Sequence, residues 1–135
     1  MPTPGRLAGG LVRLKTRADF LRVAAGRRRA VRPGLIVQAA SRPGEGESDG
    51  AMRVGFTASR KVGNAVIRNR AKRRLRAAAA AVLPQAGRAA TDYVLIARAA
   101  TGKRPYAELL ADLETALRQL GQPARQGRRR RAEEE

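Results

Sequence analysis

The clearest hydrophobic pattern is a period-two alternation over residues 52–59, which predicts a half-buried strand. Met52, Val54, Phe56 and Ala58 would point inward, and the residues between them would point outward. Two apolar runs predict further strands, and the second is continuous enough for a strand in the middle of a sheet. These runs are residues 35–40 and 93–97.

Helix start and stop signals flank two amphipathic segments. Thr16 followed by Asp19 resembles a capping box at the start of a short helix, which Gly26 would end. Pro105 would begin the last helix and Gly121 would end it. The large apolar residues of this last segment recur at helical spacing and would form one stripe facing the core. The stripe consists of Tyr106, Leu109, Leu110, Leu113, Leu117 and Leu120.

A third helical pattern covers residues 65–83 and would be closed by Pro84. Its apolar positions fall within about 80° of one another on a wheel of about 100° per residue. A stripe this narrow would dock on a sheet and leave most of the helix surface uncovered. The stripe consists of Ile67, Ala71, Leu75, Ala78 and Val82.

The predicted order of elements is helix, two or three strands, helix, strand, helix. This order is typical of an α+β domain, here a two-layer α/β sandwich with three helices on one face of a mixed sheet of about four strands. The opposite face of the sheet would remain open. We expect residues 1–12 to form a flexible lead-in, residues 13–121 a single α/β sandwich domain, and residues 122–135 a disordered charged tail. Residues 41–50 have the composition of a loop.

The composition is strongly basic: 29 Lys and Arg against 11 Asp and Glu give a formal net charge of +18. Self-repulsion of this size destabilises a compact domain, so a polyanion is the expected partner. The absence of Cys and His removes thiolate and imidazole chemistry and fits a reducing compartment. No long apolar stretch occurs, so we expect a cytoplasmic protein without a membrane partner.

The positive charge is concentrated on the 65–83 helix, with six cations from Arg68 to Arg76. No acid occurs from Gly50 to Thr91, whereas solvated amphipathic helices mix charges so that neighbouring turns attract. The mostly alanine apolar face disfavours a membrane-surface helix. Arg outnumbers Lys, and its planar fork suits phosphate, so the helix is predicted to bind nucleic acid. Because nearly every undocked side is basic, a folded RNA is favoured over a DNA groove.

The segment SRKVGNAVIRNRAKRRLR at residues 59–76 closely resembles the signature of the protein subunit of bacterial ribonuclease P, with Arg68-Asn69-Arg70 as its RNR box. The resemblance implies a compact α/β sandwich with a left-handed βαβ crossover holding the RNR helix, although the general expectation is right-handed. Other stretches resemble the family's first helix, the strand before the signature, the later strand and the last helix. These stretches are residues 14–20, 53–59, 92–98 and 106–109.

The resemblance also implies a function. Proteins of this family assist a catalytic RNA subunit that removes the 5′ leader from precursor tRNA, so the complex is an endoribonuclease. The expected partners are the ribonuclease P RNA and precursor tRNA, and Mg²⁺ would be bound mainly through RNA. The RNR helix and the loop before it would contact the RNA subunit through Arg60, Lys61, Asn64, Arg68, Asn69, Arg70, Lys72, Arg73 and Arg76.

In this family a cleft between the first helix and the sheet holds the single-stranded leader. Aromatic side chains often line it, but here Gln38 occupies a strand position where an aromatic is common, and Ala24 lies one turn after Phe20. Both Phe20 and Phe56 have core packing as the alternative role. The expected cleft residues are Arg13, Phe20, Gln38, Arg53, Thr57 and Ser59.

With neither His nor Cys, a protein active site would need a carboxylate cluster for metal-assisted hydrolysis. The acids are scattered over a loop, the last helix and the tail, so no catalytic residue and no metal site is predicted in the protein. The alternative function is a structural RNA-binding protein, of ribosomal or RNA-chaperone type, without a role in cleavage. A protein that cleaves RNA on its own is a third hypothesis.

Overall fold

The computed structural model describes residues 10–41 and 51–121. The predicted tail, most of the predicted lead-in and most of the predicted loop lie outside these residues. In chain order the elements are β1 (Val12–Arg13), α1 (Arg17–Ala25), β2 (Arg29–Arg32), β3 (Leu35–Ser41), β4 (Arg53–Thr57), the 3₁₀ helix η2 (Arg60–Val62), α2 (Ala65–Ala86), β5 (Thr91–Ala97) and α3 (Tyr106–Gly121).

The strands form one mixed sheet of five strands in the order β1-β4-β5-β3-β2. β4 lies parallel to both β1 and β5, whereas β3 runs antiparallel to both β5 and β2. β4 and β5 are therefore parallel neighbours joined through α2, which makes a βαβ unit. The α+β class and the mixed sheet are confirmed, with one strand more than the about four expected.

The two edge strands are the elements that the sequence pattern missed. β1 has only two residues, and its first, Val12, belongs to the predicted flexible lead-in. Leu11 before it is 1% exposed, so this part of the chain is packed into the domain. β2 contains two arginines, and only Ala30 among its residues is buried. Neither strand has the apolar alternation from which strands are predicted.

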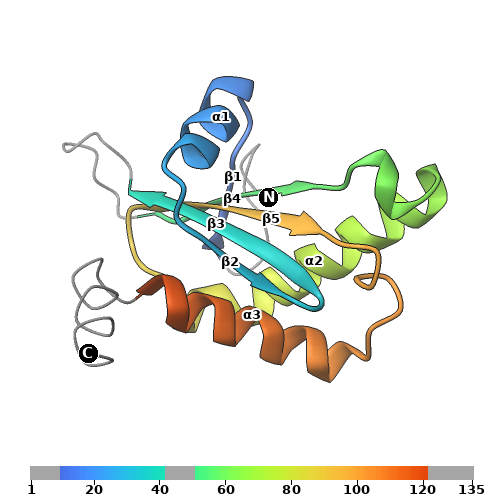
Figure 1. The fold of residues 1–135 in the computed structure, drawn as a ribbon. Coiled ribbons are helices and arrows are strands. Elements are labelled where there is room, and N and C mark those ends of the chain that lie inside the picture. Colours follow the sequence, from blue (N-terminus) through green and yellow to red (C-terminus); the bar gives the residue numbers. More distant parts are fainter. Residues whose placement is uncertain (1–9, 42–50, 122–135) are drawn as a thin grey trace, which may run out of the picture.

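Helices cover both faces of the sheet (Figure 1). α2 and α3 lie side by side on one face, and α1 lies on the other, against β3 and β5. The prediction that all helices share one face and leave the other open is therefore wrong. Beneath α1, Leu14, Val23 and Val94 form a small buried cluster, with Phe20 packed against it.

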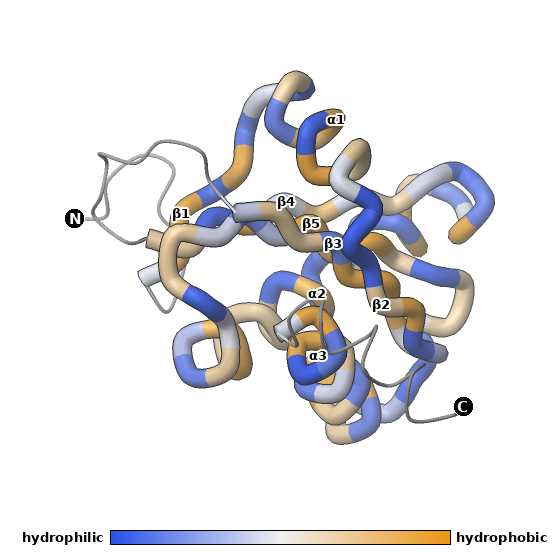
Figure 2. Tube along the Cα trace, turned by 60° about the vertical axis from the view of Figure 1, so that its left-hand side comes forward, coloured by the Kyte–Doolittle hydropathy of each residue, from blue (hydrophilic) through white to orange (hydrophobic). Residues whose placement is uncertain are grey.

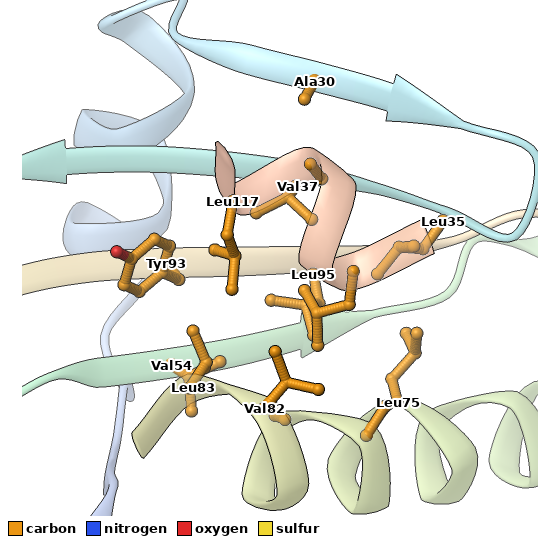
Figure 3. Packing of buried hydrophobic residues seen from close by; sticks show 14 of the residues in the cluster. Ala30, Leu35, Val37, Val54, Leu75, Val82, Leu83, Tyr93, Leu95 and Leu117 are labelled. Carbon is orange, nitrogen blue, oxygen red and sulfur yellow. The ribbon is translucent and has the colours of Figure 1, made fainter. Parts of the chain in front are cut away.

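The main core fills the space between the sheet and the α2–α3 pair. Figure 3 shows Leu75 and Val82 of α2 and Leu117 of α3 turned toward Val54 and Leu95 of the sheet. In Figure 2, hydrophobic segments occur in the sheet and on the helix turns next to it. Large aliphatic side chains on both layers therefore supply most of the buried surface.

The predicted docking stripe of α2 is confirmed except at its first residue. Ile67 is 43% exposed, so its predicted place against the sheet is wrong. It lies in the first turn of α2, where its side chain packs against Gly63 instead. The buried residues of α2 are Ala71, Leu75, Ala78, Ala79, Val82 and Leu83.

α2 also extends beyond its predicted end at Pro84 and reaches Ala86. The N–H of Gly87 closes the last turn by donating to the Leu83 carbonyl at 2.8 Å. A proline this close to a helix end costs few hydrogen bonds, so it does not stop the helix. Although α2 has 22 residues, no helix among the described residues is long and apolar enough to cross a membrane.

A buried aspartate joins α1 to the sheet. The side chain of Asp92 in β5 is 0% exposed and accepts hydrogen bonds from Arg53 in β4 at 2.6 and 2.8 Å. Arg22 of α1 donates to the same carboxylate. Two guanidinium groups offset the free-energy cost of burying this charge. Arg53, predicted to line a cleft, thus lies in the ion pairs that hold α1 on the sheet.

Candidate nucleic-acid interface

A glycine turn sets the direction in which the basic helix begins. Gly63 has a φ of 153°, and a Cβ at this position would approach the Ile67 side chain to 2.8 Å, so the turn favours glycine. Asn64 is the N-cap of α2, and its Oδ1 accepts a hydrogen bond from the Ile67 N–H at 2.9 Å. The structure therefore gives Asn64, a predicted RNA-binding residue, a capping role.

The other predicted RNA-binding residues share the outer side of α2 and of η2, and we call them the basic surface. No ion pair joins any of these cations to an acid in the part of the chain that the structure describes. Its exposed members are Arg60, Lys61, Asn69, Arg70 and Arg73, and its half-buried members are Arg68, Lys72 and Arg76.

Arg74 differs from its neighbours on the same helix. Its guanidinium donates to the Thr101 carbonyl at 2.7 Å and to the Arg104 carbonyl at 2.6 Å. These carbonyls belong to the connection between β5 and α3, so Arg74 ties α2 to that connection. Arg74 is therefore a structural cation, whereas Arg73 is exposed.

A cavity of about 140 Å³, which we call the edge cavity, lies next to the basic surface at an edge of β4. β1 pairs with β4 only at Arg53 and Val54, so the rest of this edge has no strand neighbour among the described residues. α1 supplies one wall and α2 another. The lining residues are Arg13, Leu14, Phe20, Gly55, Phe56, Lys72 and Arg76.

Aromatic and cationic groups meet in the edge cavity. Arg76 lies with its guanidinium carbon 5.8 Å from the centroid of the Phe56 ring, within cation–π range. The Nε–H groups of Arg76 and Arg68 are buried and have no hydrogen-bond acceptor among the described residues. Sites for single-stranded nucleic acid contain aromatic rings on which bases stack. They also contain hydrogen-bond donors that have no acceptor within the protein.

The structure brings together two of the six residues expected in a leader cleft, Arg13 and Phe20. Gln38 lies in β3, which β5 separates from β4. Thr57 ends β4 and Ser59 follows it, and neither lines the edge cavity. Phe20 packs against a core cluster and also lines the edge cavity, so core packing does not exclude a role for it in a cleft.

Of the remaining lining residues, Phe56 had both a cleft role and core packing as hypotheses, and the other four were not expected in a cleft. Lys72 and Arg76 were predicted only as contacts to an RNA subunit, and Leu14 and Gly55 had no predicted role there. Gly55 offered a usable signal, because a glycine inside a strand often marks a close approach of another group. Here that group is the ring of Phe20.

The buried acids of the domain are engaged by arginines and the main chain. Asp112 accepts hydrogen bonds from the Gly34 N–H at 3.0 Å and from Arg104 at 2.5 Å, and Asp92 is held by its two arginines. The described residues contain no group of three or more side chains of the metal-ligating types. These carboxylates stabilise the fold.

The fold and the site together define a class: a small, basic α+β protein with a cationic helix beside an aromatic cavity at a sheet edge. The chain belongs to the ribonuclease P protein family, because residues 10–121 match the family's sequence profile, described as Ribonuclease P.

Named relatives agree with this membership. The ribonuclease P protein component of Paramagnetospirillum magneticum is 56% identical over 115 residues, which cover 85% of this chain and 86% of the relative. The ribonuclease P protein component of Ruegeria pomeroyi is 53% identical over 117 residues, which cover 86% of this chain and 91% of that relative. The solved RNase P protein of Staphylococcus aureus superposes with a TM-score of 0.63 at 29% identity, covering 78% of this chain and 92% of that one.

Proposed function

We propose that this chain is the RNA-binding protein subunit of a ribonuclease P, which removes the 5′ leader from precursor tRNA in the cytoplasm. Its partners are a catalytic RNA subunit and precursor tRNA, and Mg²⁺ is bound mainly through RNA. Membership of the family supports the reaction and the assembly. The observation that supports the RNA contacts is the uncompensated charge of the basic surface.

In this proposal the two parts of the site bind different RNA segments, although Lys72 and Arg76 belong to both parts. The basic surface binds phosphates of the RNA subunit, because Arg60, Arg70 and Arg73 are exposed and present several donors each. The edge cavity binds the single-stranded leader, with Phe20 as a stacking face and Lys72 and Arg76 as donors to phosphate. Side chains from α1, β4 and α2 would thus hold one strand of RNA along the unpaired edge of β4.

The protein contributes binding and orientation, and the RNA contributes the chemistry. Asp92 and Asp112 are the buried acids among the described residues, and both form ion pairs with arginines. Holding the leader in place lowers the entropy cost of aligning the scissile bond with the RNA-bound metal ions. We therefore assign no step of hydrolysis to a protein side chain.

Reconstitution tests the proposal. The purified chain is added to the ribonuclease P RNA of its own organism at low Mg²⁺, and cleavage of precursor tRNA is measured. Stimulated 5′ cleavage is expected, and Arg70→Gln should lower it much more than Arg118→Gln, an exposed arginine of α3 outside the site. RNA binding without stimulation would instead support a structural RNA-binding protein, and cleavage by the chain alone would refute the assignment of chemistry to RNA.

A further inference from the structure

A second cavity lies at the end of the sheet far from the start of α2. Its volume is about 270 Å³, and it is walled by β3, the α2–β5 connection, the first half of β5 and the last residues of α3. Figure 1 shows this end of the sheet, where β5 begins and α3 ends, opposite the first turn of α2. At about 30 Å³ per water molecule, the cavity has room for a phosphate group. We call it the end cavity.

Two arginines supply positive charge to the end cavity. Arg88 lines it, and the Arg88 guanidinium has no hydrogen bond or ion pair among the described residues. Arg28 also lines it and donates to the Leu120 carbonyl at the end of α3. A guanidinium has five N–H donors, so this one bond leaves most of the Arg28 donors available.

A buried tyrosine adds a directed donor. Tyr93 is 3% exposed, and its hydroxyl oxygen accepts the Arg88 backbone N–H at 2.8 Å. The proton of that hydroxyl has no acceptor within the described residues, although the residue lines the end cavity. Burial raises the pKa of the Tyr93 hydroxyl, while the hydrogen bond from Arg88 and the charges of Arg88 and Arg28 oppose the rise. The hydroxyl therefore remains a donor at neutral pH.

Two carbonyl acceptors beside the end cavity, those of Ala89 and Leu120, are already used. The Thr91 hydroxyl donates to the Ala89 carbonyl at 3.1 Å, and the Leu120 carbonyl receives Arg28. Asp92 is the neighbouring acid in the sequence, but it is held by Arg22 and Arg53 and does not line the cavity. The end cavity consequently offers unpaired donors and positive charge, which is the complement of an anion.

We propose that the end cavity is a phosphate-binding site, separate from the basic surface and the edge cavity. Arg88 and Arg28 bind the phosphate oxygens as cations, and the Tyr93 hydroxyl donates to a third oxygen. The phosphate is part of an RNA strand or of a free nucleotide, since both present the same group. The wall of the cavity also contains the small side chains of Ala39, Ala89 and Ala90. This proposal is independent of the proposed function.

The test is an amide NMR titration of the full chain, first with inorganic phosphate and then with adenosine 5′-monophosphate. Saturable shifts are expected at Ala89, Ala90 and Tyr93, in addition to any shifts along α2. Arg88→Gln should weaken binding at these amides about tenfold, because a charged hydrogen bond is lost. The Arg88 side chain has no hydrogen-bond or ion-pair partner among residues 10–41 and 51–121, so this variant should remain folded.

Arg118→Gln is the matched control, because it removes the same charge from an exposed position that does not line the end cavity. It should leave the affinity at Ala89 and Ala90 unchanged. Equal weakening by Arg88→Gln and Arg118→Gln would mean that net charge alone attracts the anion, and the proposal would be overturned. Shifts confined to α2 would overturn it as well.

A single-stranded RNA distinguishes the two sources of phosphate. If the phosphate belongs to a strand, Arg88→Gln should reduce the salt dependence of RNA binding by about 0.7 in the slope of log affinity against log salt, relative to Arg118→Gln. If it belongs to a free nucleotide, nucleotide binding should fall and RNA binding should not. Either result supports a phosphate site.

The chain's own acids are the competing occupants. The segment between β3 and β4 contains Glu45, Glu47 and Asp49, and β3 ends at Ser41 in the cavity wall. Phosphate binding at Ala89 and Ala90 that occurs only after all three acids are changed to amides would show that a carboxylate occupies the site. That outcome would overturn the proposal, whereas equal binding with and without the changes supports it.

Discussion

The ring of Phe20 in α1 lies against Gly55 in β4 so closely that a Cβ on Gly55 would collide with it. This contact forms the wall of the edge cavity on the α1 side. It also explains a glycine in the middle of a strand, where any side chain would displace the ring. The position of the Phe20 ring in the proposed leader site thus depends on Gly55, which has no side chain and lies 35 positions later in the sequence.

Phe20→Ala should weaken binding of precursor tRNA about tenfold and leave binding of mature tRNA unchanged, because stacking on one base contributes about 1–3 kcal/mol. Gly55→Ala keeps the aromatic ring but displaces it, so it should produce the same selective loss. Leu21→Ala is the control, since Leu21 is 55% exposed on the same helix and does not line the edge cavity. Equal losses for precursor and mature tRNA would show that Phe20 acts only in the core.

Asp92→Asn should destabilise the domain by about 3 kcal/mol, because it leaves two arginines without a buried counter-charge. Urea unfolding measures this free energy. Glu114→Gln changes an exposed acid on α3 that forms no ion pair with any described residue, and it should change this free energy by less than about 0.5 kcal/mol. If the two variants were equally stable, the ion pairs of Asp92 with Arg22 and Arg53 would not hold α1 on the sheet.

Arg73→Gln and Arg74→Gln make the same chemical change at adjacent positions and should have opposite consequences. Arg74→Gln should lower the free energy of unfolding by about 1–3 kcal/mol, because hydrogen bonds to two carbonyls are lost. Arg73→Gln should preserve stability and weaken RNA binding, since this side chain is exposed. Thermal unfolding and filter binding test both, and a stability loss with Arg73→Gln would contradict the division of roles.

Multivalent anions should stabilise the chain more than chloride does at the same ionic strength, because they bind the folded state alone. The double change Arg68→Gln and Arg73→Gln should raise stability in low-salt buffer by ~0.5 kcal/mol through reduced repulsion. It should also shrink the effect of sulfate on the melting temperature. The second readout is needed because sulfate stabilises proteins generally by exclusion. A double variant that is less stable in low salt would mean that these cations make contacts within the fold.

Alkaline pH should destabilise the domain through Tyr93. Burial raises the pKa of its hydroxyl above the ordinary value of about 10, so the unfolded chain loses this proton first as the pH rises. Stability therefore falls from about pH 10 until the native hydroxyl also ionises. In a Tyr106→Phe background, tyrosinate absorbance follows Tyr93 alone, since the chain has two tyrosines. Tyr93→Phe should remove this part of the pH dependence, and an unchanged slope would refute the assignment.

Several elements were determined by the local sequence. The alternation over 52–59 predicted β4, the apolar runs predicted β3 and β5, and the leucine stripe predicted α3. The absence of acids from Gly50 to Thr91 identified the basic helix. These features are local because a strand or helix repeats its contacts every two to four residues, so its pattern is written in one short stretch. The signature segment likewise identified the family.

The contacts that make the site were decided only by the tertiary structure. Asp92 meets Arg22 and Arg53 across 70 and 39 residues of sequence, and these pairs place α1 on the face that was predicted to be open. Arg74 differs from Arg73 because it donates to two carbonyls of the β5–α3 connection, which lies about 30 residues further along the sequence. Ile67 fits the helical spacing of apolar residues, but the first turn of α2 extends away from the core and leaves this side chain exposed. The period of the apolar residues indicates which side of a helix or strand is apolar. Only the tertiary structure determines which residue of another element packs against that side.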